Sequence, residues 1–315
     1  MSEIRHRELP CENMASEPSQ DHGERSLKYS LRTWNHHSKT LTWREVEPWQ
    51  HDNDYILSGY RPSSSSYAMS LRSIWQIHNQ TFNIWSHMLG FTVFLIVAKY
   101  QFGMLRNRDG TYFDFLLFGQ FYLGIAFCLT SSSAFHTFFD HSEDVAHSFF
   151  LCDLAGIIVL TVASFYPGVY YGFYCEPHTA KAYWTMITVF GTGALIICLH
   201  PRFRGRAWHR PRTTMLILLG LSGVLPMTHA ALQFGIAQAR RQMGWDWYVG
   251  EAIFYLLGAL IYSIKIPERW NPGLFDIWGS SHQIFHVCVV LGIACHLIGA
   301  VNAVAYNNSP ETKRC

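Results

Sequence analysis

Long runs of apolar residues, separated by short polar segments, dominate the chain from about residue 80 onward. Seven runs are long enough to cross a hydrocarbon core of about 30 Å, which takes about 20 helical residues. Backbone groups in lipid must be satisfied within their own segment, so continuous runs of this length predict transmembrane helices. We expect spans near residues 83–102, 114–136, 146–166, 183–199, 213–232, 247–264 and 280–303. The pattern predicts an all-α integral membrane bundle of seven helices.

The polar flanks of these runs divide the remainder of the chain. We expect a flexible polar arm over 1–50, a membrane-proximal segment over 51–82, the transmembrane domain over 83–303 and a short C-terminal tail over 304–315. In the second part, Leu71, Trp75 and Ile77 are among apolar residues that recur at helical spacing. This spacing predicts a short interfacial helix over 70–80.

Composition supports a membrane protein. The chain is 49% hydrophobic and only 15% charged, whereas soluble domains carry about 25% charged residues. A net charge of +2 indicates no nucleic-acid partner. The eight cysteines include no CxxC pair, so we expect neither a zinc finger nor a disulfide framework. No cleavable signal peptide is recognisable at the start of the sequence, so we expect the first span to direct insertion.

Basic residues give a weak indication of orientation. With the N-terminus inside, the inner and outer short segments carry nearly equal numbers of lysine and arginine. The five arginines between the fourth and fifth spans, together with the basic residues of the arm, favour this orientation. We therefore expect a cytosolic N-terminus and a C-terminus outside.

Three histidines lie beside or within the apolar runs, where a polar side chain is costly and marks a candidate functional site. His282 and His286 are four residues apart, so they share one face of the seventh helix. His136 ends the second span, and Asp153 lies in the first two turns of the third. The end of an even span and the start of an odd span lie on the same side of the membrane. We therefore expect the four side chains near one face at similar depth, whichever way the chain is inserted.

Three imidazoles with an open fourth position are typical of a catalytic zinc site. Zinc would lower the pKa of a bound water to about 7 and so supply a hydroxide nucleophile. Asp153 could hold that water, act as a general base or be a further ligand. Ser132 lies four residues before His136 on the same helix face, so it could orient the water or bind a substrate carbonyl.

Other interpretations of these residues stay open. A membrane histidine often serves only as a hydrogen-bond partner between helices. Asp153 could pair with a basic residue or with His147. His296 lies about 15 Å along the helix axis from His286, so we expect it in the other leaflet. His87, at the start of the first span, is expected to serve as a cap or at a helix interface.

Six motifs make the chain resemble a known family. They are YILSGYR (55–61), HNQTFNIWSH (78–87), SSSAFHTFFDHS (131–142), CDLAGI (152–157), GFYCEP (172–177) and IPERWNPGLFDIWGSSHQIFH (266–286). They resemble the progestin and adipoQ receptor family, in particular its adiponectin-receptor-like branch with the fungal osmotin-receptor and haemolysin-III-related membrane proteins. The resemblance extends over residues 50–305, in matching order.

The resemblance implies seven helices, a cytosolic N-terminus and a zinc ion near the inner face. The family's ligand histidines fall on His136, His282 and His286, and its motif serine falls on Ser132. Its aspartate near the zinc-bound water falls on Asp153. The family is similar to membrane-embedded alkaline ceramidases, which implies hydrolysis of ceramide to sphingosine and fatty acid.

Two positions depart from the family pattern. Gln80 stands where the family usually has glutamate, and Leu154 where it often has tyrosine. The glutamine removes one charge near the cytosolic rim. We expect Gln80 to touch none of the candidate metal ligands, so its effect should concern regulation or partner docking.

Three functions compete. The first is a zinc-dependent lipid amidase that acts on ceramide. The second is a receptor with a structural zinc site and an extracellular protein ligand. The third, a zinc transporter, is disfavoured because the outer halves of the spans offer few carboxylates beyond Glu251. The plasma membrane and the endoplasmic reticulum are both compatible locations.

Overall fold

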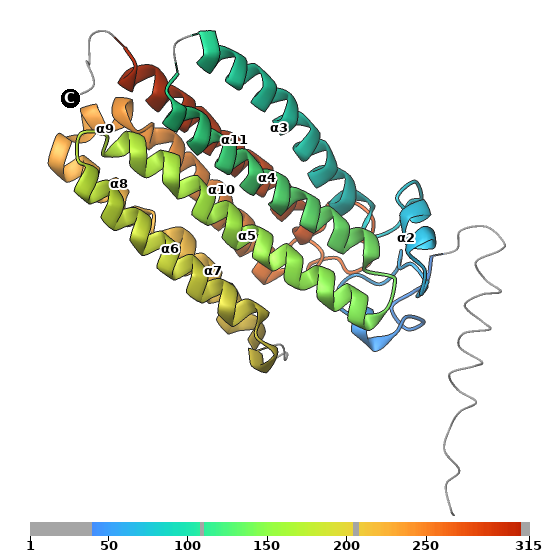
Figure 1. Ribbon diagram of the computed structural model, residues 1–315. Coiled ribbons are helices and arrows are strands. Elements are labelled where there is room, and N and C mark those ends of the chain that lie inside the picture. The colour runs from blue at the N-terminus through green and yellow to red at the C-terminus, as the bar shows by residue number, and fades with distance from the viewer. Residues whose placement is uncertain (1–39, 108–109, 204–207, 310–315) are drawn as a thin grey trace, which may run out of the picture. The chain divides into compact units, whose positions relative to one another are not determined.

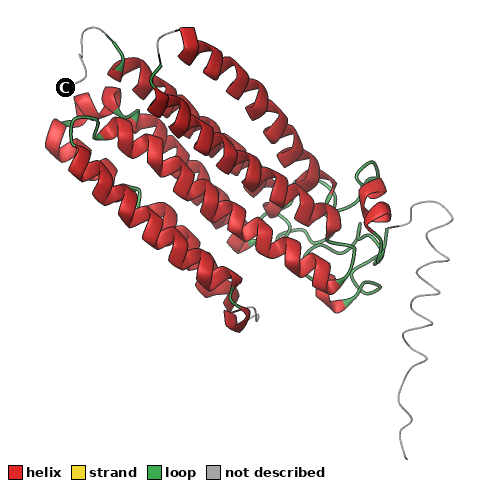
Figure 2. Ribbon diagram, viewed as in Figure 1, coloured by secondary structure: helices red, strands yellow, loops and turns green. Residues whose placement is uncertain are grey.

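The computed structural model describes residues 40–107, 110–203 and 208–309. The described helices are η1 (Pro48–Gln50), α2 (Tyr67–Ser73), α3 (Thr81–Asn107), α4 (Tyr112–Phe138), α5 (Glu143–Gly172), α6 (Pro177–Leu199), η2 (Pro201–Phe203), α7 (His209–Leu221), α8 (Val224–Phe234), α9 (Ile236–Gln242), α10 (Trp245–Ile264) and α11 (Ser281–Asn307). Among these residues the fold is entirely helical, with a single isolated β-bridge between Leu41 and Tyr60 (Figures 1 and 2).

Seven helical stretches are long and apolar enough to cross a membrane, which confirms the expected seven-helix class. Most of the observed helices run a few residues beyond the predicted spans. The fourth stretch, α6, begins at Pro177 rather than near residue 183. Proline is favoured in the first helical turn, where its missing N–H has no intrahelical partner in any case.

The fifth stretch, predicted as one helix over 213–232, consists of α7 and α8 in succession. Ser222 and Gly223 separate the two. Pro226 accounts for the break, because its nitrogen has no proton to donate to the carbonyl of Ser222 one turn earlier.

The predicted interfacial helix over 70–80 is shorter and lies earlier, as α2. Helical geometry stops before Trp75 and Ile77, which are largely exposed. The Thr81 side chain accepts from the His78 amide and donates to the Gln76 carbonyl. Side-chain bonds of this kind compete with the helical backbone ladder and end it here.

The core of the bundle lies between α4, α11 and α3. Buried side chains include Phe118 and Leu129 of α4, Phe94 of α3, and Ile293 and Leu297 of α11. Half of the apolar window of α4 and of α11 is buried, against 11% for α10. α4 and α11 are therefore the helices most enclosed by their neighbours, and residues on their facing sides are shielded from lipid.

The segment before α3 folds at one end of the bundle, where α4 ends and α5 begins (Figure 1). Val46, Ile56 and Tyr60 form a small apolar cluster with Leu41 and Trp43. The Leu41 and Tyr60 backbones exchange two hydrogen bonds, with N–O distances of 2.7 and 3.1 Å. These residues build a cap over the end of the bundle that carries the histidines.

Candidate metal centre

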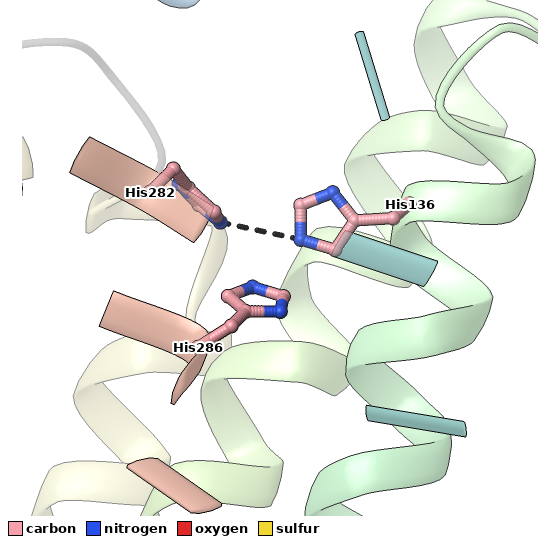
Figure 3. A group of neighbouring side chains, drawn as sticks. All are labelled: His136, His282 and His286. Atoms are coloured by element: carbon pink, nitrogen blue, oxygen red, sulfur yellow. Dashed lines mark hydrogen bonds between the residues drawn. The ribbon is translucent and has the colours of Figure 1, made fainter. Parts of the chain in front are cut away.

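The three candidate ligands converge between two helices. His136 lies in the last turn of α4, and His282 and His286 lie in the first two turns of α11. Their rings point toward one another across the gap between the helices (Figure 3). One nitrogen from each ring lies within 4.8 Å of the others, so the group could hold a metal ion. The expected convergence at one end of the bundle is observed.

Two of these nitrogens are already at the spacing of metal ligands. His136 Nε2 lies 3.2 Å from His282 Nε2. Two nitrogens bound to one tetrahedral zinc at 2.0–2.1 Å lie about 3.3 Å apart. His136 and His286 are each 2% exposed, so bulk water does not surround the group. The donor set and its spacing fit a borderline metal such as zinc, with a fourth position open.

Hydrogen bonds from α3 and the residue before it set the protonation of two rings. Gln80 Oε1, which can only accept, lies 2.8 Å from His136 Nδ1 and also accepts from Asn83 Nδ2. The His136 proton is therefore on Nδ1. Ser86 donates to the Asn83 carbonyl and so accepts from His286 Nδ1, 3.2 Å away. In both rings Nε2 keeps its lone pair for a metal, as support of ligating histidines requires.

The expectation that Gln80 touches no candidate ligand is wrong. Its side chain is buried and bonds His136 directly. The sequence placed it at the rim because it precedes α3 by one residue. The cap folded over this end of the bundle brings it inward. The glutamine at this position therefore bears on the candidate metal centre itself.

His87 is not a helix cap. It lies in the second turn of α3 and is 3% exposed. Its ring stacks on that of His286, with centroids 3.8 Å apart and an interplanar angle of 13°. Neither of its nitrogens has a hydrogen-bond partner among the described residues. It is a fourth imidazole at the edge of the group, packed against a ligand ring.

Asp153 and Ser132 adjoin the three histidines without belonging to the tight group. The Asp153 carboxylate is not among the atoms that lie within 4.8 Å of one another. The Ser132 hydroxyl lies near this carboxylate. Ser132 is 2% exposed, one turn before His136 on α4. The two side chains form an interhelical pair next to the candidate metal site.

Tyr262 is a neighbour that sequence analysis missed. It lies in the last turns of α10, and its ring meets that of His282 edge to face, with centroids 5.0 Å apart. A tyrosine inside an apolar run offers little signal, because aromatic residues are common in transmembrane helices. Its position adds a hydroxyl-bearing side chain to the wall of the site.

Arg61 fixes the end of α4 that carries His136. Its guanidinium donates to the carbonyls of His136 and Thr137 at 2.6 and 2.9 Å. It also lies 3.1 Å from Asp140 in a buried ion pair. Burial lowers the pKa of Arg61, and the Asp140 carboxylate opposes that shift. A cation at the carbonyl end of a helix also complements the helix dipole.

Glu268 fixes the start of α11 in a similar way. Its fully buried carboxylate accepts from the Ser281 backbone N–H at 2.7 Å and from the Ser281 hydroxyl. Asn53 donates to it at 3.0 Å. A carboxylate at a helix N-terminus satisfies amides that lack intrahelical partners. The loop before α11 thus positions His282 one residue beyond the anchored serine.

His78 supports the site from the segment before α3. Its Nε2 donates to the Ser73 carbonyl and its Nδ1 accepts from the Gln80 amide, both at 3.1 Å. Burial, followed by the positive charge of Arg61, lowers the pKa of His78 to about 2. The ring is therefore neutral at physiological pH, and in that form it holds the Gln80 backbone.

Residues near the other end of the bundle form a separate arrangement. His296 Nδ1 lies 2.8 Å from Glu251 Oε2, and both side chains are largely buried. His296 is not part of the histidine group, as expected from its distance along α11. Cys175, which follows α5, is disulfide-bonded, whereas we expected no disulfide framework from the spacing of the cysteines.

These observations define a heptahelical integral membrane protein with a buried histidine triad near one end of its bundle. Residues 75–297, more than half of the chain, match the family described as "Haemolysin-III related". The chain belongs to this family, which includes the adiponectin-receptor-like and progestin and adipoQ receptor proteins.

Three relatives show the range of the family. The chain is 34% identical to "Adiponectin receptor protein" of Drosophila melanogaster, over 90% of this chain and 64% of the relative. It is 34% identical to "Progestin and adipoQ receptor-like protein 1" of Caenorhabditis elegans, over 85% and 62%. It is 35% identical to "ADIPOR-like receptor IZH2" of Saccharomyces cerevisiae, over 84% of each. The chain thus spans less than two thirds of the two animal relatives.

Proposed function

We propose that this protein is a zinc-containing, adiponectin-receptor-like membrane protein with intrinsic lipid amide hydrolase activity, linked to lipid and metal homeostasis signalling. The observation that carries the proposal is the collection of His136, His282 and His286 around one point. Buried polar groups within a membrane bundle are energetically costly, so their presence marks a candidate functional site. A pair of imidazole nitrogens held 3.2 Å apart is compatible with a shared cation.

Zn²⁺ bound here would polarise an amide carbonyl and make a coordinated water acidic near neutral pH. Asp153 would accept the proton of the attacking water and return a proton to the leaving amine. Ser132, which lies near Asp153, would hydrogen-bond that carboxylate to hold it in position and would orient the substrate carbonyl. Gln80 and Ser86 would keep the two ligand rings in the tautomer that presents Nε2.

Ceramide is the proposed substrate class. Its two hydrocarbon chains are at home in the bilayer, so it would enter sideways between helices and place its amide at the shallow, buried site. Fatty acid and sphingosine would leave into the membrane. The relatives' names describe receptors, and an extracellular protein ligand is proposed as the input that would adjust this activity.

The alternative is a non-catalytic receptor in which zinc only ties α4 to α11. Asp153 separates the two, because it lies outside the tight histidine group. For a hydrolase, Asp153→Ala should abolish ceramide hydrolysis while zinc content stays unchanged, both measured on one purified sample. Native protein that holds zinc but releases no fatty acid from ceramide would favour the receptor alternative.

We also propose a cytosolic N-terminus, which places the histidine end of the bundle on the cytosolic side. The arginines between α6 and α7 support this orientation. The disulfide-bonded Cys175 follows the third span, hence lies at the opposite end, and disulfides form in oxidising compartments. The plasma membrane and the endoplasmic reticulum both offer such a face.

A further inference from the structure

A small cavity opens beside the histidine triad toward the cap formed by residues before α3. Its volume is about 30 Å³, enough for a single water molecule or ion. His282 lies on one wall, and Gln50, Asp52 and Asn83 are among the other residues that line it. We call this space the access cavity. It joins a candidate metal ligand to residues of the cap.

Two buried oxygens in the access cavity lack partners. Gln50 Oε1 and Asn83 Oδ1 have no hydrogen-bond partner among the described residues, although the two side chains are 1% and 4% exposed. Their amide nitrogens donate elsewhere, Gln50 to the Arg61 carbonyl and Asn83 to Gln80. Both groups therefore turn an acceptor, not a donor, toward unoccupied space, and buried acceptors require a donor or a cation.

The charge around the access cavity favours a cation. Asp52 and Asp276 both line it. Asp276 is occupied by the Leu57 amide and the Ser58 hydroxyl, whereas Lys265 donates to the backbone carbonyl of Asp52 and not to its carboxylate. Burial is the main cause that raises the pKa of the Tyr60 phenol on the same wall, and the negative charges of Asp52, Asp276 and Asp54 add to it.

One nearby positive charge is compensated. Arg61 is paired with Asp140 and bonded to the end of α4, so its charge is already balanced. Oxygen donors also hold zinc less well than imidazoles do, because zinc prefers nitrogen and sulfur ligands. An ion held by the cavity oxygens would therefore pass on to the histidines.

We propose that the access cavity, with the oxygens of Gln50, Asp52 and Asn83, is a transit site through which a divalent metal ion reaches His282 from the aqueous side. This rests on the proposed metal function of the triad. It adds a route and a second, weaker site, and it assigns Asp52 the role of attracting the ion.

The test measures how fast Zn²⁺ loads into chelator-stripped, full-length protein in detergent, by stopped-flow transfer from a fluorescent zinc buffer. Asp52→Asn should slow loading about 10-fold, the lower range of electrostatic effects on association. The equilibrium affinity should change by less than about two-fold, because release slows equally. Asp144→Asn is the matched control, since Asp144 is exposed, does not line the cavity and is not among the charges that act on Tyr60. It should load within about two-fold of the native protein.

Each other outcome overturns a defined part of the account. Equal loading rates for Asp52→Asn and Asp144→Asn would overturn the transit site and leave the cavity as a site for water. A loss of equilibrium affinity as large as the loss of rate would make Asp52 a permanent ligand and also overturn the transit role. Native protein that takes up no Zn²⁺ would overturn the proposed function and, with it, the transit site.

Discussion

Among single residues, the ability of the histidine triad to bind a metal depends on which ring nitrogen of each histidine carries the proton. Gln80 and Ser86 decide this for His136 and His286, because each offers an acceptor to Nδ1. Gln80 is a neutral acceptor, whereas the resemblance to the family leads us to expect a carboxylate at this position. A neutral partner withdraws less of the Nδ1 proton and leaves the ring a weaker donor to a metal than a carboxylate would.

Replacing Gln80 by leucine should weaken zinc binding. Leucine cannot accept from His136 Nδ1, so the ring loses its fixed tautomer and orientation, and such changes cost about 10- to 100-fold in metal affinity. Competition with a chelator of known affinity measures the change. Gln101→Leu is the control, since Gln101 is equally buried on α3 but bonds Tyr122, far along the helix from the triad. If both variants bound zinc as tightly as the native protein, Gln80 would have no part in ligand support.

His78 predicts a pH dependence of stability. Its pKa is about 2 in the folded protein and about 6.5 when exposed, so the unfolded chain binds a proton that the folded one refuses. The stability that the neutral His78 ring contributes to the folded protein is therefore fully present above pH 6.5. It is lost progressively as the pH falls below that value. His78→Gln should reduce the fall in melting temperature between pH 7 and pH 5, measured by thermal unfolding in detergent. An unchanged slope would mean that His78 is not held neutral.

At the scale of helices, two anchors hold the triad, one on each helix. Arg61 bonds the end of α4, and Glu268 bonds the start of α11. Both come from irregular segments, residues 40–66 and 265–280, rather than from the spans themselves. The loops before α3 and α11 therefore set the register of His136 against His282.

Removing Arg61 should be strongly destabilising. Arg61→Ala leaves Asp140 buried without its cation, which costs about 3–5 kcal/mol. Arg61→Ala combined with Asp140→Ala should lose less than the single variant, since no charge is left unpaired. Arg240→Ala provides the comparison, because the Arg240–Asp246 pair is more than half exposed and contributes little. Thermal unfolding of all three variants gives the order of their losses in stability. If Arg61→Ala lost no more stability than Arg240→Ala, the Arg61–Asp140 pair would contribute no more than an exposed ion pair.

Much of the helical arrangement could be predicted from the sequence, because span length follows from apolar runs and parity fixes which helix ends share a side of the membrane. Parity places His136 on the same side as His282 and His286, but their contact also requires that α4 packs near α11. The inward position of Gln80 and the stacking of His87 on His286 could not be predicted, since both depend on how α3 packs on α4 and α11. Pro226 indicates the break before α8. Span prediction from hydropathy misses this break, because hydropathy takes no account of the N–H that proline lacks.

At the scale of the whole bundle, the proposed orientation decides which compartment meets the triad. The sequon Asn307–Asn308–Ser309 cannot report it, because Asn307 is buried in α11 and donates to the carbonyls of Gln242 and Ala303. An epitope tag added after residue 315 should instead be accessible only from the non-cytosolic side, in intact or selectively permeabilised cells. A C-terminal tag reached from the cytosol would reverse the orientation and place the histidines on the opposite face.

In the proposed function, α4 and α11 close around one cation. The most direct measurement is the metal content of the intact, detergent-purified protein beside a His282→Ala/His286→Ala double variant. We predict about one zinc per native chain and a near-complete loss in the variant, because a single remaining imidazole does not retain zinc. Native protein with no more zinc than the double variant would contradict the claim.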